Sequence, residues 1–462
     1  MAMTDAARDT AYATASLNEV TPELIDGILE HLEHGRVDDI RAAVARLSPV
    51  GVAYLLEQVA SDPRAQLVGI LKDNLDPETL VELDEEVRDE VLENLEPKDI
   101  AAAAQELDSD DAAEIIEDLP EVERREVLSE LPAAERAAIE ATLAYPEDSA
   151  GRLMQRDLVA VPDSWTVGEV IDHCRDATDL PDDVYDLFVV DADRRLRGSV
   201  ALGRMLRAKR LVPIVDIMDP EIPSIPATAD QEEVAHIFRD QNLVSCPVVD
   251  DERRLLGVIM VDDVVDVIDE EAEDDLARMG GVASVDIHEP AVETTRARFR
   301  WLFLNLVTAF LASAVIGQFE NELQKIVALA VLMPIVASMG GNAGTQTVTV
   351  AVRALAMGEL TAANALRFFV KEALVGGANG FMFALIVGVV TWLWFHDPRI
   401  ALTIAAAMVI NLVAAALAGV LIPLGLQRLK IDPAVSSTVF LTTVTDVVGF
   451  LAFLGLAALF LI

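Results

Sequence analysis

The chain has 462 residues, of which 52% are hydrophobic, and it carries a formal net charge of −43 at neutral pH. The charge is unevenly placed: residues 301–462 contain seven basic and seven acidic side chains, so the whole excess lies on residues 1–300. This balance excludes non-specific binding to nucleic acid, it favours cations as partners of the acidic part, and it predicts two physically different modules.

The N-terminal part, residues 1–148, predicts an acidic helical domain. Apolar residues recur three and four apart in "LIDGILEHL", "IRAAVARL" and "AAEIIEDL", as on one face of a helix. Pro and Asp separate these runs, so we expect many short helices in a superhelix or small bundle without a strict repeat. A solvated acidic surface without a specific ligand is the alternative explanation of the charge. The polar start "MAMTDAARDT" predicts no signal peptide.

An internal repeat follows. "VVDADRRLRGSV" and "VVDDERRLLGVI" align without a gap, 59 residues apart, each within a strand–helix–strand–strand–helix pattern. The repeat resembles a tandem pair of α+β CBS domains over residues 149–209 and 210–270. The resemblance implies a regulatory pair that commonly binds an adenine nucleotide, or else a purely structural or dimerising pair. Cys174 and Cys246 show neither metal-type nor disulfide spacing, which indicates a reducing compartment.

Residues 271–300 predict a linker between the acidic part and the apolar part. Gly280 and Gly281 interrupt this segment. Its second half predicts an amphipathic linker (plug) helix that leads to Trp301.

Residues 301–462 predict an all-α transmembrane domain of five helices. Each apolar segment is long enough to cross roughly 30 Å of hydrocarbon. Positive charges gather before the first segment, between the second and third, and between the fourth and fifth, so we expect residues 1–300 to be cytoplasmic and the C-terminus to lie outside. The segments are about 301–318, 327–350, 368–395, 400–425 and 434–461.

The second apolar segment contains an unusual polar and glycine-rich stretch, "PIVASMGGNAGTQTVTV". Gly340 and Gly344 form a small-xxx-small pair, which permits close approach of helices. We expect the glycines and Pro334 to interrupt the helix and expose backbone carbonyls to a wet cavity, since irregular backbone is tolerated there. Close helix packing alone is the alternative.

The fifth segment carries one carboxylate, Asp446, in an apolar run. Thr442 and Thr445 share a helical face with it, and so do Thr438 and Gly449. An ionisable residue inside a membrane segment marks a functional site by default. Mg²⁺ prefers hard oxygen ligands, keeps several waters and often uses only one or two carboxylates. The pattern therefore favours a Mg²⁺ path, and Na⁺ or H⁺ coupling less specifically.

Together these parts resemble the MgtE family of Mg²⁺ channels and transporters. The most specific pieces are "PIVASMGGNAGTQTVTVAVRAL", "DPAVSSTVFLTTVTDVVGFLAF" and "VDDVVDVIDEEAEDD". The resemblance implies a homodimer in the plasma membrane, with a pore between the second and fifth segments of each subunit. Hydrated Mg²⁺ would lie near Asp446, and Asp432 opens the same segment. The expected pore-lining residues are Gly340, Gly341, Asn342, Gly344, Thr438, Thr442 and Thr445.

The resemblance also implies cytoplasmic domains that bind Mg²⁺ and close the pore when the ion is plentiful. Two positions depart from the family pattern, since Asn242 stands where a sensor aspartate is expected and Thr438 where an asparagine is. The implied sensor residues of the second CBS domain and linker are Asp230, Asp263, Asp266, Glu271, Asp274 and Asp275; Asp110, Asp111 and Glu114 of the helical domain are candidate partners.

Three rival functions remain to be weighed against Mg²⁺ transport. A CBS-regulated secondary transporter for another cation or solute would favour an internal repeat among the membrane segments, which the sequence does not show. An intramembrane metalloprotease needs a motif such as H-E-x-x-H, and the sequence has none. A receptor that is merely anchored in lipid has no need of Asp446. We therefore expect a transporter and not an enzyme.

Overall fold

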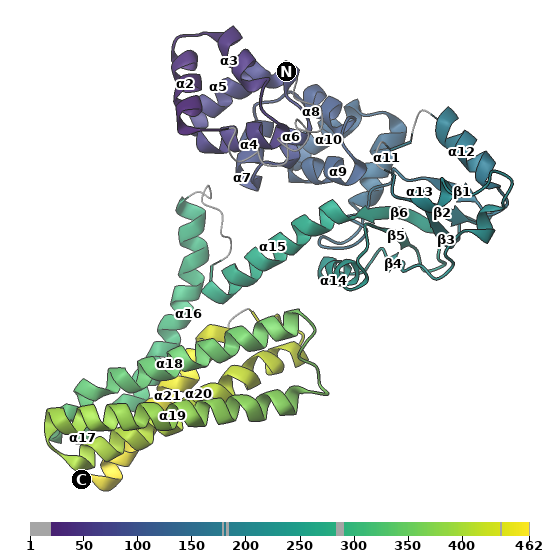
Figure 1. Ribbon diagram of the computed structural model, residues 1–462. Coiled ribbons are helices and arrows are strands. Elements are labelled where there is room, and N and C mark those ends of the chain that lie inside the picture. Colours follow the sequence, from purple (N-terminus) through teal and green to yellow (C-terminus); the bar gives the residue numbers. More distant parts are fainter. Residues whose placement is uncertain (1–19, 178–179, 182–183, 283–290, 435–436, 462) are drawn as a thin grey trace, which may run out of the picture. The chain divides into compact units, whose positions relative to one another are not determined.

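The computed structural model describes residues 20–177, 180–181, 184–282, 291–434 and 437–461. The chain forms two compact units, Met1–Glu270 and Glu271–Ile462 (Figure 1). Parts of the expected helical domain (1–19) and linker (283–290) lie outside the described residues.

The first unit begins with a series of short helices, as the sequence predicts. Two of them begin at a hydroxyl cap followed by proline: the Thr21 side chain accepts from Leu24 N–H, and that of Ser48 accepts from Gly51 N–H. Their apolar faces share one core, in which Ile116 is fully buried. The helices are α2 (Pro22–Glu33), α3 (Val37–Val44), α4 (Pro49–Gln58), α5 (Ser61–Leu71), η1 (Lys72–Asn74), α6 (Glu78–Val81), α7 (Glu85–Leu92), α8 (Pro97–Ala104), α9 (Ser109–Asp118), α10 (Glu121–Glu130) and α11 (Ala133–Thr142).

Two three-stranded sheets follow, with the same topology in each copy of the repeat. The first strand pairs in parallel with the second, and the second pairs antiparallel with the third. The pairing register shifts after Val189 in one sheet and after Val248 in the other, at matching positions of the repeat. The elements are β1 (Ala160–Pro162), α12 (Val167–Asp176), β2 (Asp186–Val190), β3 (Leu196–Ala201), α13 (Leu202–Met205), η2 (Ile214–Asp216), β4 (Ile225–Pro226), α14 (Gln231–Gln241), β5 (Ser245–Val249), β6 (Leu255–Met260) and α15 (Val261–Gly280).

Asn242 has a local structural role in the second copy. It follows α14 in the left-handed conformation, with φ of 53°. Asparagine adopts this conformation more readily than most residues, and it is a common helix terminator. The departure from an aspartate is therefore compatible with the backbone at this position.

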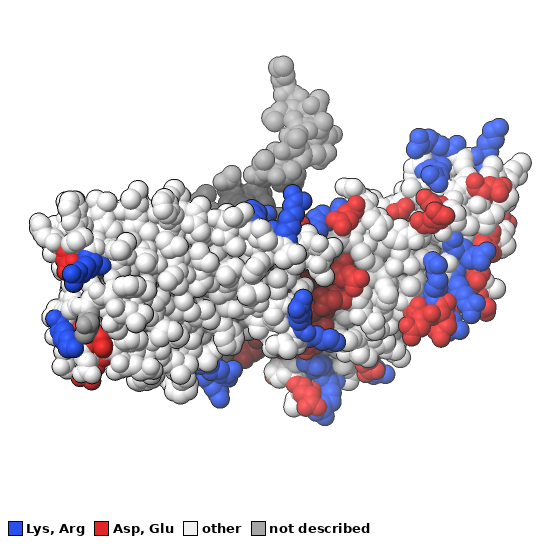
Figure 2. All heavy atoms as spheres, turned by 90° about the horizontal axis from the view of Figure 1, so that it is seen from below, with Lys and Arg blue, Asp and Glu red and all other residues white. Residues whose placement is uncertain are grey.

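The second unit is a bundle of long apolar helices. In the described part of the chain, five helices are long and apolar enough to cross a membrane, as the sequence predicts. The visible face of this bundle in Figure 2 is a broad uncharged band with charged side chains at its ends. The helices are α16 (Ala291–Gly317), α17 (Glu320–Lys325), α18 (Val327–Ala356), α19 (Ala365–Phe395), α20 (Pro398–Arg428) and α21 (Ser437–Phe460).

The spanning helices differ in how much the bundle covers them. In the most apolar window of α20, 56% of the residues are buried, against 6% in α16. α20 is therefore the central helix of the bundle. The expected linker helix is continuous with the first span, because α16 runs through Trp301 without a break.

The expected interruption of the second span is wrong. α18 is one continuous helix through Pro334 and the glycines. A proline removes only one backbone hydrogen bond, and threonine hydroxyls supply extra ones: Thr345 Oγ1 donates to Gly341 O at 3.0 Å and Thr349 Oγ1 to Thr345 O at 2.9 Å. In an apolar surrounding a broken helix would leave backbone groups unpaired, so the helical form is favoured.

Candidate functional site

A polar face runs along α18 and the adjoining α21. Asn342 and Thr345 are exposed on α18, and Thr442 is exposed on α21. The two helices meet here, since a Cβ added to Gly341 would lie 4.0 Å from Thr442 Cγ2. Thr442 Oγ1 donates to Thr438 O, which leaves the hydroxyl oxygen as an acceptor on this face.

Asp446 lies one helical turn beyond Thr442. Its side chain is half-buried. The described residues offer it no hydrogen bond and no ion pair. Within the described part of the chain, the carboxylate thus lies beside a polar face without a cationic partner, as the sequence predicts.

Three of the expected pore-lining residues instead make contacts inside the bundle. Gly340 faces Asn411, and Gly344 faces Leu441 so closely that a Cβ would lie 2.6 Å from Leu441 Cδ1. Thr445 is fully buried and donates to Thr442 O at 3.1 Å. Gly340 and Gly344 therefore serve close packing of helices, which was the alternative explanation of the glycine-rich stretch.

An arginine links the end of α15 to the loop between α20 and α21. Arg278 donates to Asp432 Oδ2 at 2.7 Å and to Asp274 Oδ2 at 2.6 Å. Burial raises the pKa of the nearby Asp275, and the negative charge of Asp432 raises it further. Thr438 Oγ1 donates to the carbonyl of Met279 at 3.0 Å, which also ties the end of α15 to α21.

A second acidic contact lies in the first unit, between α9 and the first turns of α15. Asp110 is only 9% exposed, and its Oδ1 has no hydrogen-bond partner among the described residues. Burial raises the pKa of Asp110 well above its usual range, followed in size by the charge of Asp263. Burial also raises the pKa of Asp111 and of Asp263 to about 7 each, and that of Asp266 to a smaller extent. These carboxylates therefore repel one another when ionised.

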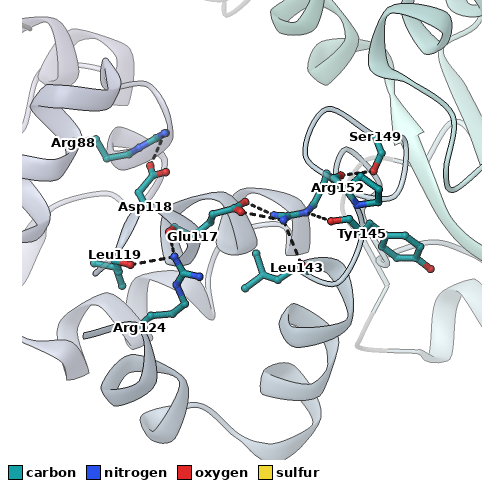
Figure 3. Close-up of polar contacts among 10 residues, drawn as sticks. Arg88, Glu117, Asp118, Leu119, Arg124, Leu143, Tyr145, Ser149 and Arg152 are labelled. Carbon is teal, nitrogen blue, oxygen red and sulfur yellow. Dashed lines mark hydrogen bonds and ion pairs between the residues drawn. The ribbon is translucent and has the colours of Figure 1, made fainter. Parts of the chain in front are cut away.

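The opposite end of α9 is held by arginines (Figure 3). Glu117 accepts two bonds from Arg152, one of them 3.0 Å long from Nη2, and Arg152 also donates to the carbonyls of Tyr145 and Leu143. Ser109 Oγ accepts from the backbone N–H of Arg156 at 2.8 Å. Helix α9 is thus held at both ends by the segment that contains Arg152 and Arg156, which precedes β1.

The other expected sensor residues have partners or positions of their own. Glu114 forms an ion pair of 2.8 Å with the buried Arg88, which also binds Asp118 at 2.7 Å (Figure 3). Asp230 caps α14 by accepting from Glu232 N–H at 3.0 Å. Glu271 is half-buried in the middle of α15. Within the ranges that the structure describes, no group of three or more His, Cys, Asp or Glu side chains could hold a metal ion as it stands.

Two arginines at these contacts were missed by the sequence reasoning. Arg278 is the only basic residue in "EEAEDDLARMGG" and follows Asp274 by four residues, a helical ion-pair spacing that could have identified it. No local pattern marks Arg152, because its partner Glu117 is distant in the chain.

Family models match most of the chain. A model described as "MgtE intracellular N domain" matches residues 47–148, the CBS domain model matches 150–210 and 214–270, and a model described as "Divalent cation transporter" matches 333–456.

Curated relatives agree with these matches. The magnesium transporter MgtE of Thermus thermophilus is 36% identical over 70% of this chain and 72% of its own length. The magnesium transporter MgtE of Bacillus subtilis is 27% identical over 96% of this chain and 99% of its own length. A crystal structure of the cytosolic domain of the Mg²⁺ channel MgtE in complex with ATP is 31% identical, covers 53% of this chain and 99% of that one, and has a TM-score of 0.48. The chain therefore belongs to the MgtE family of magnesium transporters.

Proposed function

We propose that this protein is a Mg²⁺-selective channel that admits Mg²⁺ across the plasma membrane and closes when Mg²⁺ binds its acidic domains inside the cell. In this proposal residues 1–300 are cytoplasmic, the C-terminus lies outside, and the chain has no catalytic activity. The polar face of α18 and α21 forms the ion path, and the acidic contacts of α15 form the sensor.

The observation that carries the ion path is that Asp446 has no ion pair or hydrogen bond among the described residues and lies on the face with exposed amide and hydroxyl groups. A hydrated Mg²⁺ needs oxygen acceptors for its water shell and one or two carboxylates to offset its charge. Asn342 and Thr442 offer exposed acceptors on this polar face, and Asp446 lies one helical turn beyond Thr442. The charge of one carboxylate only partly offsets a divalent cation, so a second copy of the chain is the natural complement, and we propose a homodimer with the path between the copies.

The contact of α9 with α15 supports the gating half of the proposal. Ionised Asp110 and Asp263 repel in a buried place, and a divalent cation between them would remove the repulsion. Asp111 and Asp266 would contribute further oxygens. Carboxylate oxygens are suitable ligands for Mg²⁺. The described residues do not form a complete ligand set on their own, so binding would have to draw these carboxylates closer together.

The end of α15 supplies a second sensing contact in the same proposal. Asp274, Asp275 and Asp432 surround Arg278, whose single charge does not balance three carboxylates. A cation bound here would hold α15 against the loop that precedes α21. We further propose an adenine nucleotide at the CBS pair, on the strength of the CBS family match alone.

Uptake into lipid vesicles that contain the purified full-length protein tests the ion path. Asp446→Asn keeps the shape and removes the charge, so Mg²⁺ uptake should fall at least about tenfold, as expected for a charge placed at an ion path. Asp397→Asn is a matched control, because Asp397 caps α20 by accepting from Arg399 N–H at 2.8 Å, and asparagine caps a helix equally well.

Three results would count against the proposal. Asp446→Asn could leave Mg²⁺ uptake intact, or Asp397→Asn could lower it equally. Uptake that stops without a Na⁺ or H⁺ gradient would instead favour a secondary transporter.

A further inference from the structure

A buried amide lies at the centre of the membrane unit. Asn411, in the middle of α20, has no exposed surface. Its Nδ2 donates a hydrogen bond of 2.8 Å to the carbonyl of Val336 on α18, while its Oδ1 is buried without a hydrogen-bond partner among the described residues. An unpaired buried oxygen is costly, so packing alone would favour an apolar residue here.

Two glycines from different helices make room for this amide. A Cβ added to Gly340 of α18 would lie 2.2 Å from Asn411 Nδ2, and one added to Gly449 of α21 would lie 2.8 Å from the same atom. Real Cβ contacts are never this short, so a side chain at either position would displace the amide or its helix. Asn411 thus touches α18 and α21 at once and takes the place of both missing side chains.

The same two glycines adjoin the proposed ion path. Gly340 directly precedes Gly341, whose added Cβ would lie 4.0 Å from Thr442 Cγ2. Gly449 follows Asp446 by three residues, which is nearly one helical turn. The contact with Asn411 therefore sets the distance and rotation of α18 relative to α21 at the level of Asp446.

We propose that Asn411 is a positioning residue for ion selection, which acts by holding α18 and α21 at a fixed spacing through its contacts with Gly340, Gly449 and the Val336 carbonyl. It touches no group of the proposed path itself. The inference rests on the proposed function, because it takes the polar face of α18 and α21 as the ion path. Mg²⁺ demands a narrower geometry than Ca²⁺, so a shift of the helices changes the preference between the two ions.

The test measures Mg²⁺ and Ca²⁺ uptake per inserted protein in lipid vesicles, with five variants of the full chain, the fifth of which combines Gly344→Ala with Asn411→Ala. Asn411→Ala removes the amide and its bond. Gly340→Ala adds a methyl group that collides with the amide, and the double variant has the methyl group without the amide. Gly344→Ala is the matched control, because its added Cβ meets Leu441 and not Asn411.

The expected result is that the effect of Gly340→Ala depends on whether the Asn411 amide is present. Asn411→Ala and Gly340→Ala should each lower the ratio of Mg²⁺ to Ca²⁺ uptake by about tenfold, since a binding geometry must be held to within about 0.5 Å. In the Asn411→Ala background, Gly340→Ala should add no further loss. Gly344→Ala should have the same effect with and without Asn411.

Two results would overturn the inference. Gly340→Ala could cost the same in both backgrounds, or the uptake ratio could stay unchanged while only the amount of folded protein falls. If Asn411→Ala does not insert into the vesicles, Gly449→Ala is measured in its place, and it must also lower the ratio of Mg²⁺ to Ca²⁺ uptake. Asp446→Asn, assayed in parallel, separates failure of the ion path from failure of this inference.

Discussion

Removal of one carboxylate from the α9–α15 contact should stabilise that contact when Mg²⁺ is absent. Asp111 is the position of choice, because burial and the charges of Glu114, Asp108, Asp262 and Asp266 raise its pKa from 3.8 to about 7. A difference of about 3 in pKa corresponds to about 4 kcal/mol between the two forms of the contact. This figure is the largest stabilisation that Asp111→Asn can give.

The pH dependence has a defined direction. Below pH 4, Asp111 is protonated whether the contact is open or closed, so wild type and Asp111→Asn should be equally stable. Between about pH 4 and pH 7, the closed contact of the wild type loses up to about 4 kcal/mol from this group, because the open form ionises while the buried carboxyl group stays protonated, and above pH 7 the loss is complete. The variant should not show this loss, and at pH 8 its contact should open less often.

Amide hydrogen exchange on the full-length protein in detergent, with a chelator present, measures this opening. Peptides from α9 and from the start of α15 report the local free energy of opening, after correction for the intrinsic pH dependence of exchange. Millimolar Mg²⁺ should protect these peptides in the wild type and protect them less in Asp111→Asn. Asp251→Asn is the control, since it removes the same charge from an exposed turn.

Parallel pH profiles of wild type and Asp111→Asn between pH 5 and 8 would refute the reasoning. An equal gain of protection in Asp251→Asn would do so as well, because it would show that net charge and not the buried contact controls opening.

Two further outcomes follow from single contacts. Arg278→Gln should release Asp432 for cation binding and lower the Mg²⁺ concentration that half-inhibits uptake by up to about fivefold, since a half-exposed ion pair contributes about 1 kcal/mol or less; an unchanged or higher concentration would contradict this. Gly257→Ala should destabilise the first unit by about 1–3 kcal/mol in thermal unfolding, because its Cβ would lie 2.7 Å from the carbonyl oxygen of Gln155. Gly203→Ala, with no atom within 4 Å of the added Cβ, should leave the unfolding temperature nearly unchanged.

The domain organisation could be predicted because long apolar segments and an ungapped repeat are strong sequence patterns. Five spanning helices follow from length and hydropathy, which depend little on tertiary contacts. The paired sheets follow from an ungapped repeat, and the structure places even the register shifts at Val189 and Val248 in matching positions.

The wrong prediction concerns the second span. Glycine and proline interrupt helices in water, where a freed carbonyl finds a solvent partner. Most of α18 is apolar, so intrahelical pairing is favoured there, and the helix continues through Pro334 and Gly340. Gly340 is required for packing instead, because Asn411 approaches it too closely for a side chain. Only the three-dimensional arrangement of α18, α20 and α21 reveals this contact.

The pairing of charged groups could not be predicted from sequence. Glu114 has the acidic neighbours of a sensor residue, yet it binds Arg88. Asp110 and Asp263 lie far apart in the chain, and their approach depends on how α9 rests on the CBS pair. Composition predicts that cations are attracted, whereas the fold decides which carboxylates meet.

The attachment of α9 by Arg152 has a consequence for the speed of any response. Asp110 and Glu117 lie seven residues apart on one helix, which is about 10 Å, and the helix is bonded at each end, by Arg156 N–H at Ser109 and by Arg152 at Glu117. While these bonds hold, repulsion among the carboxylates shifts the helix without detaching it. The carboxylates then keep a high effective concentration for one another, so in the proposed mechanism closing after a cation arrives would be a unimolecular step, independent of how much protein the membrane contains.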